Sequence, residues 1–232
     1  MYGAAEFSRN TDVAVVADAE NLARLGDALR ALKASVTAVP PFTPDVLARG
    51  HAVHFRCAAA DDTRLAVMAR MRNVAPFAEC WERRTTSRLA GVGEIEVFGL
   101  ADLVACKKTR RNKDWPIVQR LVDVHVAGFA QEPTEDRLRF WLRELRTPAL
   151  LFDAVALAPA LAAGVASERP AVAATLAGYD DPEARAAAVR AALAEEEARE
   201  RAADEAYWRP LLAEQAEMRA ALRRGELGLG WP

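Results

Sequence analysis

The segment SRNTDVAVVAD, residues 8–18, places a short β-branched run between two acids. Because β-branched residues favour extended backbone, residues 12–17 are predicted to form a strand with Asp12 at its first position. The residues that follow, DAENLARLGDALRALKA, carry leucines at helical spacing, and Asp18 is suited to capping the start of that helix. The segment therefore predicts a strand followed by a helix, with an acid at the point where the strand begins.

Further strands are predicted where apolar and polar residues alternate. Three runs show this alternation: HAVHFRC (51–57), TRLAVMARM (63–71) and EIEVFG (94–99). In the first of them, Ala52, His54 and Arg56 fall on one face and Val53, Phe55 and Cys57 on the other, as in a half-buried strand. The proline-rich stretch VPPFTPDVL predicts a loop and a short turn between the first helix and these strands.

From about Leu100 onward the apolar residues recur at helical spacing, and Asp114 followed by Trp-Pro is typical of a helix start. The charged run at 180–206 is expected to be a solvated, salt-bridged helix face, with a partner-binding helix as the alternative. The pattern predicts an α+β fold. We expect a small mixed β-sheet flanked by helices in residues 1–128, followed by an all-helical C-terminal region in residues 129–232.

The composition describes a chain able to bury a core, since 52% of its 232 residues are hydrophobic and 28% are charged. Acids (33) and bases (31) nearly cancel, so the net charge of -2 does not indicate nucleic-acid or membrane binding. The three cysteines are widely spaced and form no C-x-x-C pair, which favours reduced thiols over a zinc site or disulfides. Without a visible signal peptide or a long apolar run, we expect a cytoplasmic protein with no membrane partner.

An acid at a strand start is one part of a two-metal site for phosphoryl or nucleotidyl transfer. Such a site holds two cations about 4 Å apart by carboxylates on adjacent strands. Two of these acids commonly stand at positions i and i+2, because alternate residues of a strand share one face. Here Asp12 is present, but the i+2 position is Ala14.

These residues resemble the minimal nucleotidyltransferase superfamily. The pattern is Arg9-x-Thr11-Asp12-hydrophobic-x-hydrophobic, followed by a helix beginning near ENLARL. The later segment DLVACKKTRRNKDWPIVQRL is similar to the signature of a bacterial branch related to abortive-infection toxins. The resemblance extends over residues 2–127 and implies a sheet of nucleotidyltransferase type.

The resemblance also implies a degenerate active site. It makes Asp12 the surviving catalytic metal ligand, with Arg9 and Thr11 as its supports. Acids are expected at positions 14 and 66, where this chain has Ala14 and Ala66. The family's upstream glycine turn, which approaches the triphosphate, is missing, so we expect an N-terminal truncation. One carboxylate holds Mg²⁺ poorly, so metal binding is expected to be weak.

A second group of residues is implied to contact the nucleotide phosphates. The resemblance implies that Lys107 or Lys108 contacts a nucleotide phosphate, and that Asp114, which follows Lys113, helps to order the site. The alternative is that the lysines lie on the surface and that Asp114 caps a helix. The basic cluster KKTRRNK, residues 107–113, is equally compatible with a phosphate or RNA contact and with a solvated loop.

Two functions follow from these observations. The first is a nucleotidyltransferase-like protein that ancestrally moved a nucleoside monophosphate from an NTP to an acceptor, and that is weak or inactive as a pseudoenzyme. The alternative is a non-catalytic binding or regulatory protein of a toxin–antitoxin-like pair on the same fold, with a protein or RNA partner.

Overall fold

The computed structural model describes residue 2 and residues 10–229, and it divides the chain into two compact units. The sheet unit contains Asn10–Arg84 together with the described residues from Ala206 onward. The helical unit contains Tyr2 and Thr85–Glu205. Helix α10 (Pro182–Arg223) contributes residues to both units. These units group the residues differently from the predicted domains 1–128 and 129–232, because helices α4 (Leu100–Lys107) and α5 (Asp114–Phe129) pack with the helices that follow them.

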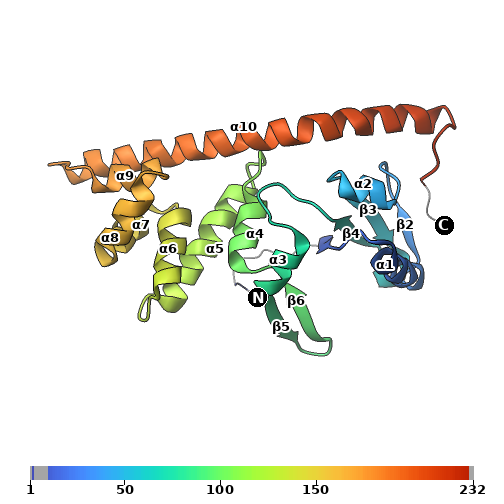
Figure 1. Cartoon of the computed structure of the whole chain (residues 1–232), viewed down its shortest axis with the longest axis horizontal. Helices are drawn as coiled ribbons and strands as arrows, with labels where there is room; N and C mark the ends of the chain where they lie inside the picture. Colours follow the sequence, from blue (N-terminus) through green and yellow to red (C-terminus); the bar gives the residue numbers. More distant parts are fainter. Residues whose placement is uncertain (1, 3–9, 230–232) are drawn as a thin grey trace. The chain divides into compact units, whose positions relative to one another are not determined.

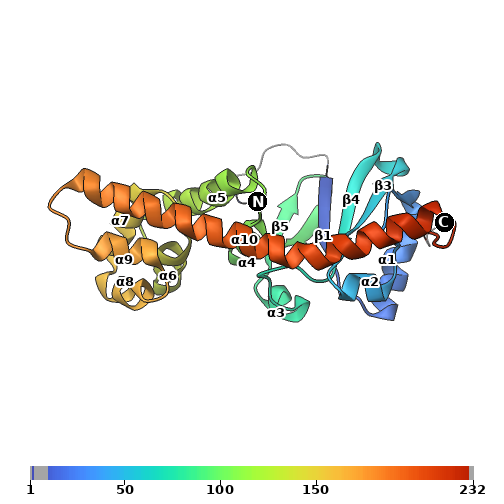
Figure 2. The ribbon, with the colours of Figure 1, turned by 90° about the horizontal axis from the view of Figure 1, so that it is seen from above.

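The sheet unit is built on a mixed four-stranded sheet (Figures 1 and 2). Its strand order is β1-β4-β3-β2, in which β1 runs parallel to β4 and the other neighbours are antiparallel. The strands are β1 (Asn10–Ala14), β2 (Ala34–Val36), β3 (Val53–Cys57) and β4 (Thr63–Met68). The helices are α1 (Ala19–Ala31), α2 (Pro44–Ala48) and α3 (Phe77–Glu82), and a 3-10 turn, η1, covers Ala58–Ala60.

One face of this sheet is apolar and packs against α1 and α2. The alternation of β3 sends Val53, Phe55 and Cys57 into the core, while His54 and Arg56 stay exposed on the other face. Helix α1 contributes Leu22 and Leu29 to the same core. It begins where the sequence predicts, because the Asp18 carboxylate accepts a hydrogen bond from the Asn21 amide at 2.7 Å. The prediction of an amphipathic helix after the first strand is confirmed.

The last part of α10 completes the sheet unit. Met218 packs against the core, and Glu214 contacts both Arg49 and His51 on the segment between α2 and β3. Between those two residues, Gly50 adopts φ +101° and lies against the Tyr207 hydroxyl. The backbone there has a conformation and a closeness of approach that favour glycine.

The helical unit begins with a two-stranded hairpin and continues as packed helices. The strands are β5 (Thr85–Leu89) and β6 (Gly93–Val97). The helices are α4 (Leu100–Lys107), α5 (Asp114–Phe129), α6 (Glu135–Glu144), α7 (Pro148–Leu157), α8 (Pro159–Ala166), α9 (Pro170–Leu176) and α10 (Pro182–Arg223). Helices α7 to α10 each begin at a proline, whose fixed φ and missing N–H suit the first helical position. Trp141, Leu142 and Leu151 are among the most buried residues of the core that these helices share.

The predicted α+β class, with a mixed sheet and a helical C-terminal region, is confirmed. Two strands, β2 and β5, were not predicted. The charged run lies in one helix, residues 182–223, that continues past Pro210, and its exposed side carries ion pairs such as Arg199–Glu195, as the sequence predicts. In the helical unit one side of α10 is buried, including Val189, Leu193 and Asp204, because it packs against the other helices.

Within the described residues, no single helix is long and apolar enough to cross a membrane. Helices α7 and α8 reach the required length and composition only as a pair, and the chain bends by 117° between them.

Candidate functional site

Asp12 lies on the exposed face of the sheet, directly opposite Ala66. The two residues are register partners across the parallel pair of β1 and β4, and His54 on β3 is the partner of Ala66 on its other side. Asp12, Ala66 and His54 therefore form a row across three neighbouring strands. Asp12 and His54 are exposed, whereas Ala66 between them is only 6% exposed.

Ala14 belongs to the same face, two residues beyond Asp12 on β1. Successive residues of a strand point to opposite faces, so Asp12 and Ala14 share a face while Val13 and Val15 pack in the core. Neighbouring strands lie about 4.8 Å apart, and residues i and i+2 of a strand are separated by roughly 7 Å. Positions 12, 14 and 66 are thus close enough for three carboxylates to share a pair of cations.

The residues present at these positions supply one carboxylate. Among the described residues, no group of three His, Cys, Asp or Glu side chains is placed to hold a metal ion. Asp18 lies beyond the end of β1 and is engaged as the cap of α1. Asp61 and Asp62 form the turn between η1 and β4 with left-handed backbones, and Asp62 lies 3.6 Å from the Arg56 guanidinium.

The other sequence-predicted neighbours of Asp12 are placed differently. Thr11 pairs with Leu65 and points to the opposite face of the sheet from Asp12. Arg9 lies outside the described residues. The structure therefore brings Asp12 together with Ala14, Ala66 and His54, and it directs Thr11 away from them.

The predicted phosphate-contacting residues belong to the helical unit. Lys108, the residue after α4, forms a half-buried ion pair with Glu144 at 2.6 Å. Lys107 is the last residue of α4 and is partly exposed, and Lys113 is exposed just before α5. Because Lys108 already has a carboxylate partner, a phosphate at this position would have to compete with Glu144.

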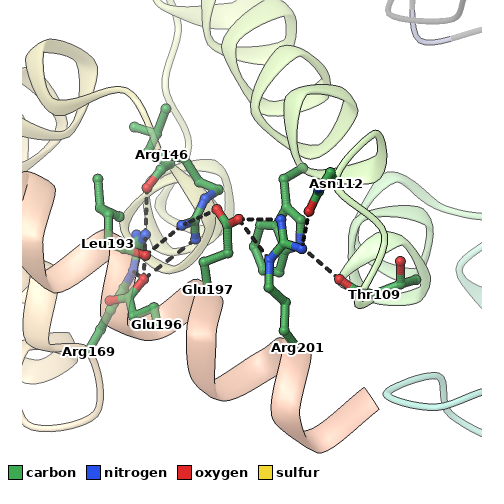
Figure 3. A network of polar contacts seen from close by, with 10 residues as sticks. Thr109, Asn112, Arg146, Arg169, Leu193, Glu196, Glu197 and Arg201 are labelled. Atoms are coloured by element: carbon green, nitrogen blue, oxygen red, sulfur yellow. Dashed lines mark hydrogen bonds and ion pairs between the residues drawn. The ribbon is translucent and has the colours of Figure 1, made fainter. Parts of the chain in front are cut away.

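Asp114 is buried and holds the basic loop in place. Its carboxylate accepts a hydrogen bond from the Thr109 hydroxyl at 2.5 Å, and the Trp115 indole donates to the Thr109 carbonyl at 2.8 Å. Helix α10 holds the other side of the loop, where Arg201 donates to Asn112 (Figure 3). The Arg110 amide donates to Asp204, which also belongs to α10. The backbone of the cluster KKTRRNK is therefore a folded part of the helical unit.

A buried network of arginines and glutamates joins α10 to the rest of the helical unit (Figure 3). The Arg169 guanidinium donates to the carbonyls of Leu142 and Leu145, at the C-terminal end of α6, and pairs with Glu196 at 3.3 Å. Arg146 lies between Glu196 and Glu197 and stacks on the Trp115 ring. Burial lowers the pKa of Arg146, and the two glutamates oppose this shift.

Sequence reasoning missed this network because the glutamates stand in a run that looks solvated. A weaker signal was present, since Arg169 stands between two apolar stretches, GVA and PAVAATL, where a cation that becomes buried requires partners. The network explains how the helical unit holds together.

No family model matches the chain, and the searches of curated proteins and of solved structures gave no match either.

Proposed function

We propose that the chain is a nucleotidyltransferase-like protein whose metal site has decayed to a single carboxylate, leaving it weak or inactive as a transferase. The observation that carries the proposal is the register of β1 and β4. It places Asp12 opposite Ala66 and next to Ala14 on one exposed sheet face. These are the three positions at which the sequence resemblance expects metal-binding acids.

The chemistry explains why two alanines matter. In two-metal transfer, the cations bridge the triphosphate and the attacking hydroxyl, and carboxylates hold both cations in place. Mg²⁺ sheds its water reluctantly and needs carboxylates together with substrate phosphates. Asp12 alone would anchor at most one cation weakly, so an NTP would be positioned poorly for attack.

Restoring the acids tests this proposal. We expect Ala14→Asp with Ala66→Asp to bind Mn²⁺ or Mg²⁺ measurably by calorimetry, with Asp12→Asn removing that binding. The matched control is Ala23→Asp with Ala28→Asp, which adds the same charge at exposed positions of α1. Because Ala66 is confined between Asp12 and His54, Ala14→Asp alone provides a milder second variant.

Two results would contradict the proposal. One is efficient nucleotide transfer by the unmodified chain with Mg²⁺, since the alanines would then be compatible with full catalysis. The other is folded variants with restored acids that bind the metal no better than the control.

The alternative is a non-catalytic binding protein, in a toxin–antitoxin-like pair, with a protein or RNA partner. The single acid at the predicted metal positions favours it. Thermal unfolding with each NTP and Mg²⁺ separates the two, because a ligand at 100 times its dissociation constant adds about 2.7 kcal/mol to the stability. A nucleotide-dependent shift supports the transferase-like reading, and its absence for every nucleotide supports the alternative.

A further inference from the structure

A second polar row crosses the exposed face of the sheet, two residues from Asp12. Arg64 on β4 and Arg56 on β3 are register partners, with Asn10 on β1 beyond Arg64 and Ser35 on β2 beyond Arg56. All four residues are exposed. The row therefore places two arginines opposite each other on neighbouring strands. The Asn10 amide and the Ser35 hydroxyl stand at its two ends.

Two arginines directly opposite each other are an unfavourable pair. Facing residues of an antiparallel pair have Cβ atoms about 5 Å apart, so like charges there repel. Among the described residues Arg64 has no ion pair, and Arg56 has only the long, exposed contact with Asp62 at 3.6 Å. An exposed contact of this kind contributes little to stability. The repulsion is thus left largely uncompensated within the described chain.

We propose that the row of Asn10, Arg64, Arg56 and Ser35 binds the phosphate group of a small phosphorylated ligand. A phosphate carries close to two negative charges and several acceptor oxygens, whereas a carboxylate carries one charge and two oxygens. Two guanidinium forks on adjacent strands match the larger charge and oxygen count.

The surroundings of the row select for a compact ligand. On one side of the row, Asp12 stands two residues beyond Asn10 on β1, a separation of about 7 Å along an extended strand. Asp62 lies at the turn on the other side, just before β4 begins. A polyanion extended along the strands would pass one of these carboxylates, whereas a single phosphate or pyrophosphate fits between them. The inference needs no metal and does not depend on the proposed transferase ancestry.

Calorimetry with pyrophosphate in metal-free, low-salt buffer tests the inference. We expect Arg56→Gln and Arg64→Gln each to weaken pyrophosphate binding about tenfold, as for the loss of one hydrogen-bonded charge. Asp62→Asn should tighten binding, because it removes the competing carboxylate. The matched control, Arg24→Gln with Arg30→Gln, removes two exposed cations from α1 and should leave binding unchanged.

Adenosine monophosphate and adenosine then separate the phosphate from the nucleoside. Binding of the monophosphate without binding of adenosine supports the proposal. It is overturned if pyrophosphate does not bind the full chain, or if the α1 control weakens binding as much as Arg64→Gln. Tighter binding of a single-stranded oligonucleotide than of pyrophosphate would also overturn it, in favour of a nucleic-acid surface. Because Asp62→Asn is expected to strengthen binding, a folding defect in an arginine variant cannot imitate the full pattern.

Discussion

The His51 imidazole is fully buried and hydrogen-bonds through Nε2 to the Glu214 carboxylate at 2.8 Å, across 163 residues of sequence. With the proton on Nε2, Nδ1 is left as an acceptor facing the Gln215 amide at 3.5 Å. Arg49 adds a second contact to Glu214 at 3.1 Å. The hydrogen bond from His51 is the main cause that lowers the pKa of Glu214 below its ordinary value of 4.5, and Arg49 adds to it.

This contact predicts an acid-dependent loss of stability. A carboxyl whose pKa is lowered by folding stabilises the folded state above its unfolded pKa, and this contribution is lost as the pH falls through the folded pKa. We expect Glu214→Gln to be less stable than the unmodified chain at pH 7, and the difference to shrink below about pH 4.5. Urea unfolding of the variant and of the unmodified chain between pH 7 and pH 3 measures this difference in stability. Glu217→Gln, at an exposed position of α10, is the control. If the difference in stability between the two proteins stays constant down to pH 3, the ionised Glu214 carboxylate does not stabilise the fold through His51.

A second prediction concerns Gly50. Its φ of +101° is unfavourable for any side chain, and an added Cβ would lie 2.7 Å from the Tyr207 hydroxyl. Gly50→Ala should therefore destabilise the sheet unit by about 1–3 kcal/mol. Combining it with Tyr207→Phe should recover the part of this loss that comes from the clash with the hydroxyl. The part that comes from the unfavourable backbone conformation should remain. Chemical unfolding of the single and double variants forms the test, and equal losses would show that the hydroxyl does not contribute.

The third prediction is a pH effect in the helical unit. Burial, followed by the charge of Arg137, lowers the pKa of His125 below its ordinary value of 6.5. The Trp141 indole donates to Nδ1 of this histidine at 2.9 Å, so protonation at Nδ1 would break the bond. Since the unfolded chain binds the proton more readily, stability should fall as the pH drops below about 6.5.

His125→Gln, which keeps an acceptor for Trp141, should remove this part of the pH dependence. The exposed His54→Gln should retain it. An NMR titration of the His125 ring follows the same event directly, and an apparent pKa above 6.5 would contradict the prediction.

The fourth prediction concerns Arg169. Arg169→Met leaves the largely buried Glu196 with only the longer ion pair to Arg146 and removes the donors to the Leu142 and Leu145 carbonyls, so we expect a loss of about 3–5 kcal/mol. Arg143→Met, which breaks an exposed pair with Glu168, should cost less than about 1 kcal/mol. Equilibrium unfolding in urea compares the two. Similar losses would show that burial does not strengthen the Arg169 network.

Local patterns predicted much of the fold. The alternation of β3 and β4 and the Asp18 cap are visible in a few residues each, because side-chain direction and capping depend on near neighbours. Strand β2 has only three residues, too few to show an alternation. The strand TTSRL of β5 directly follows the short helix α3, and its polar residues gave no apolar face to recognise.

The candidate site depends on pairings that no local pattern contains. That Asp12 faces Ala66, and that Arg56 faces Arg64, follows from strand register between segments far apart in the sequence. The buried side of α10 was not foreseen for a similar reason. Helix periodicity identifies α10 as a helix, but it does not show that Arg169 will satisfy the carbonyls at the end of α6 together with Glu196.

Helix α10 also has a consequence for synthesis. The sheet unit contains β1 to β4, yet its contacts with Tyr207 and Glu214 come from residues translated much later. The 163 residues between His51 and Glu214 take roughly 10–30 s to translate. Throughout that interval the nascent sheet has an uncovered imidazole and an uncovered glycine turn. The surface of the sheet unit that α10 later covers therefore stays exposed until the last part of α10 has been synthesised.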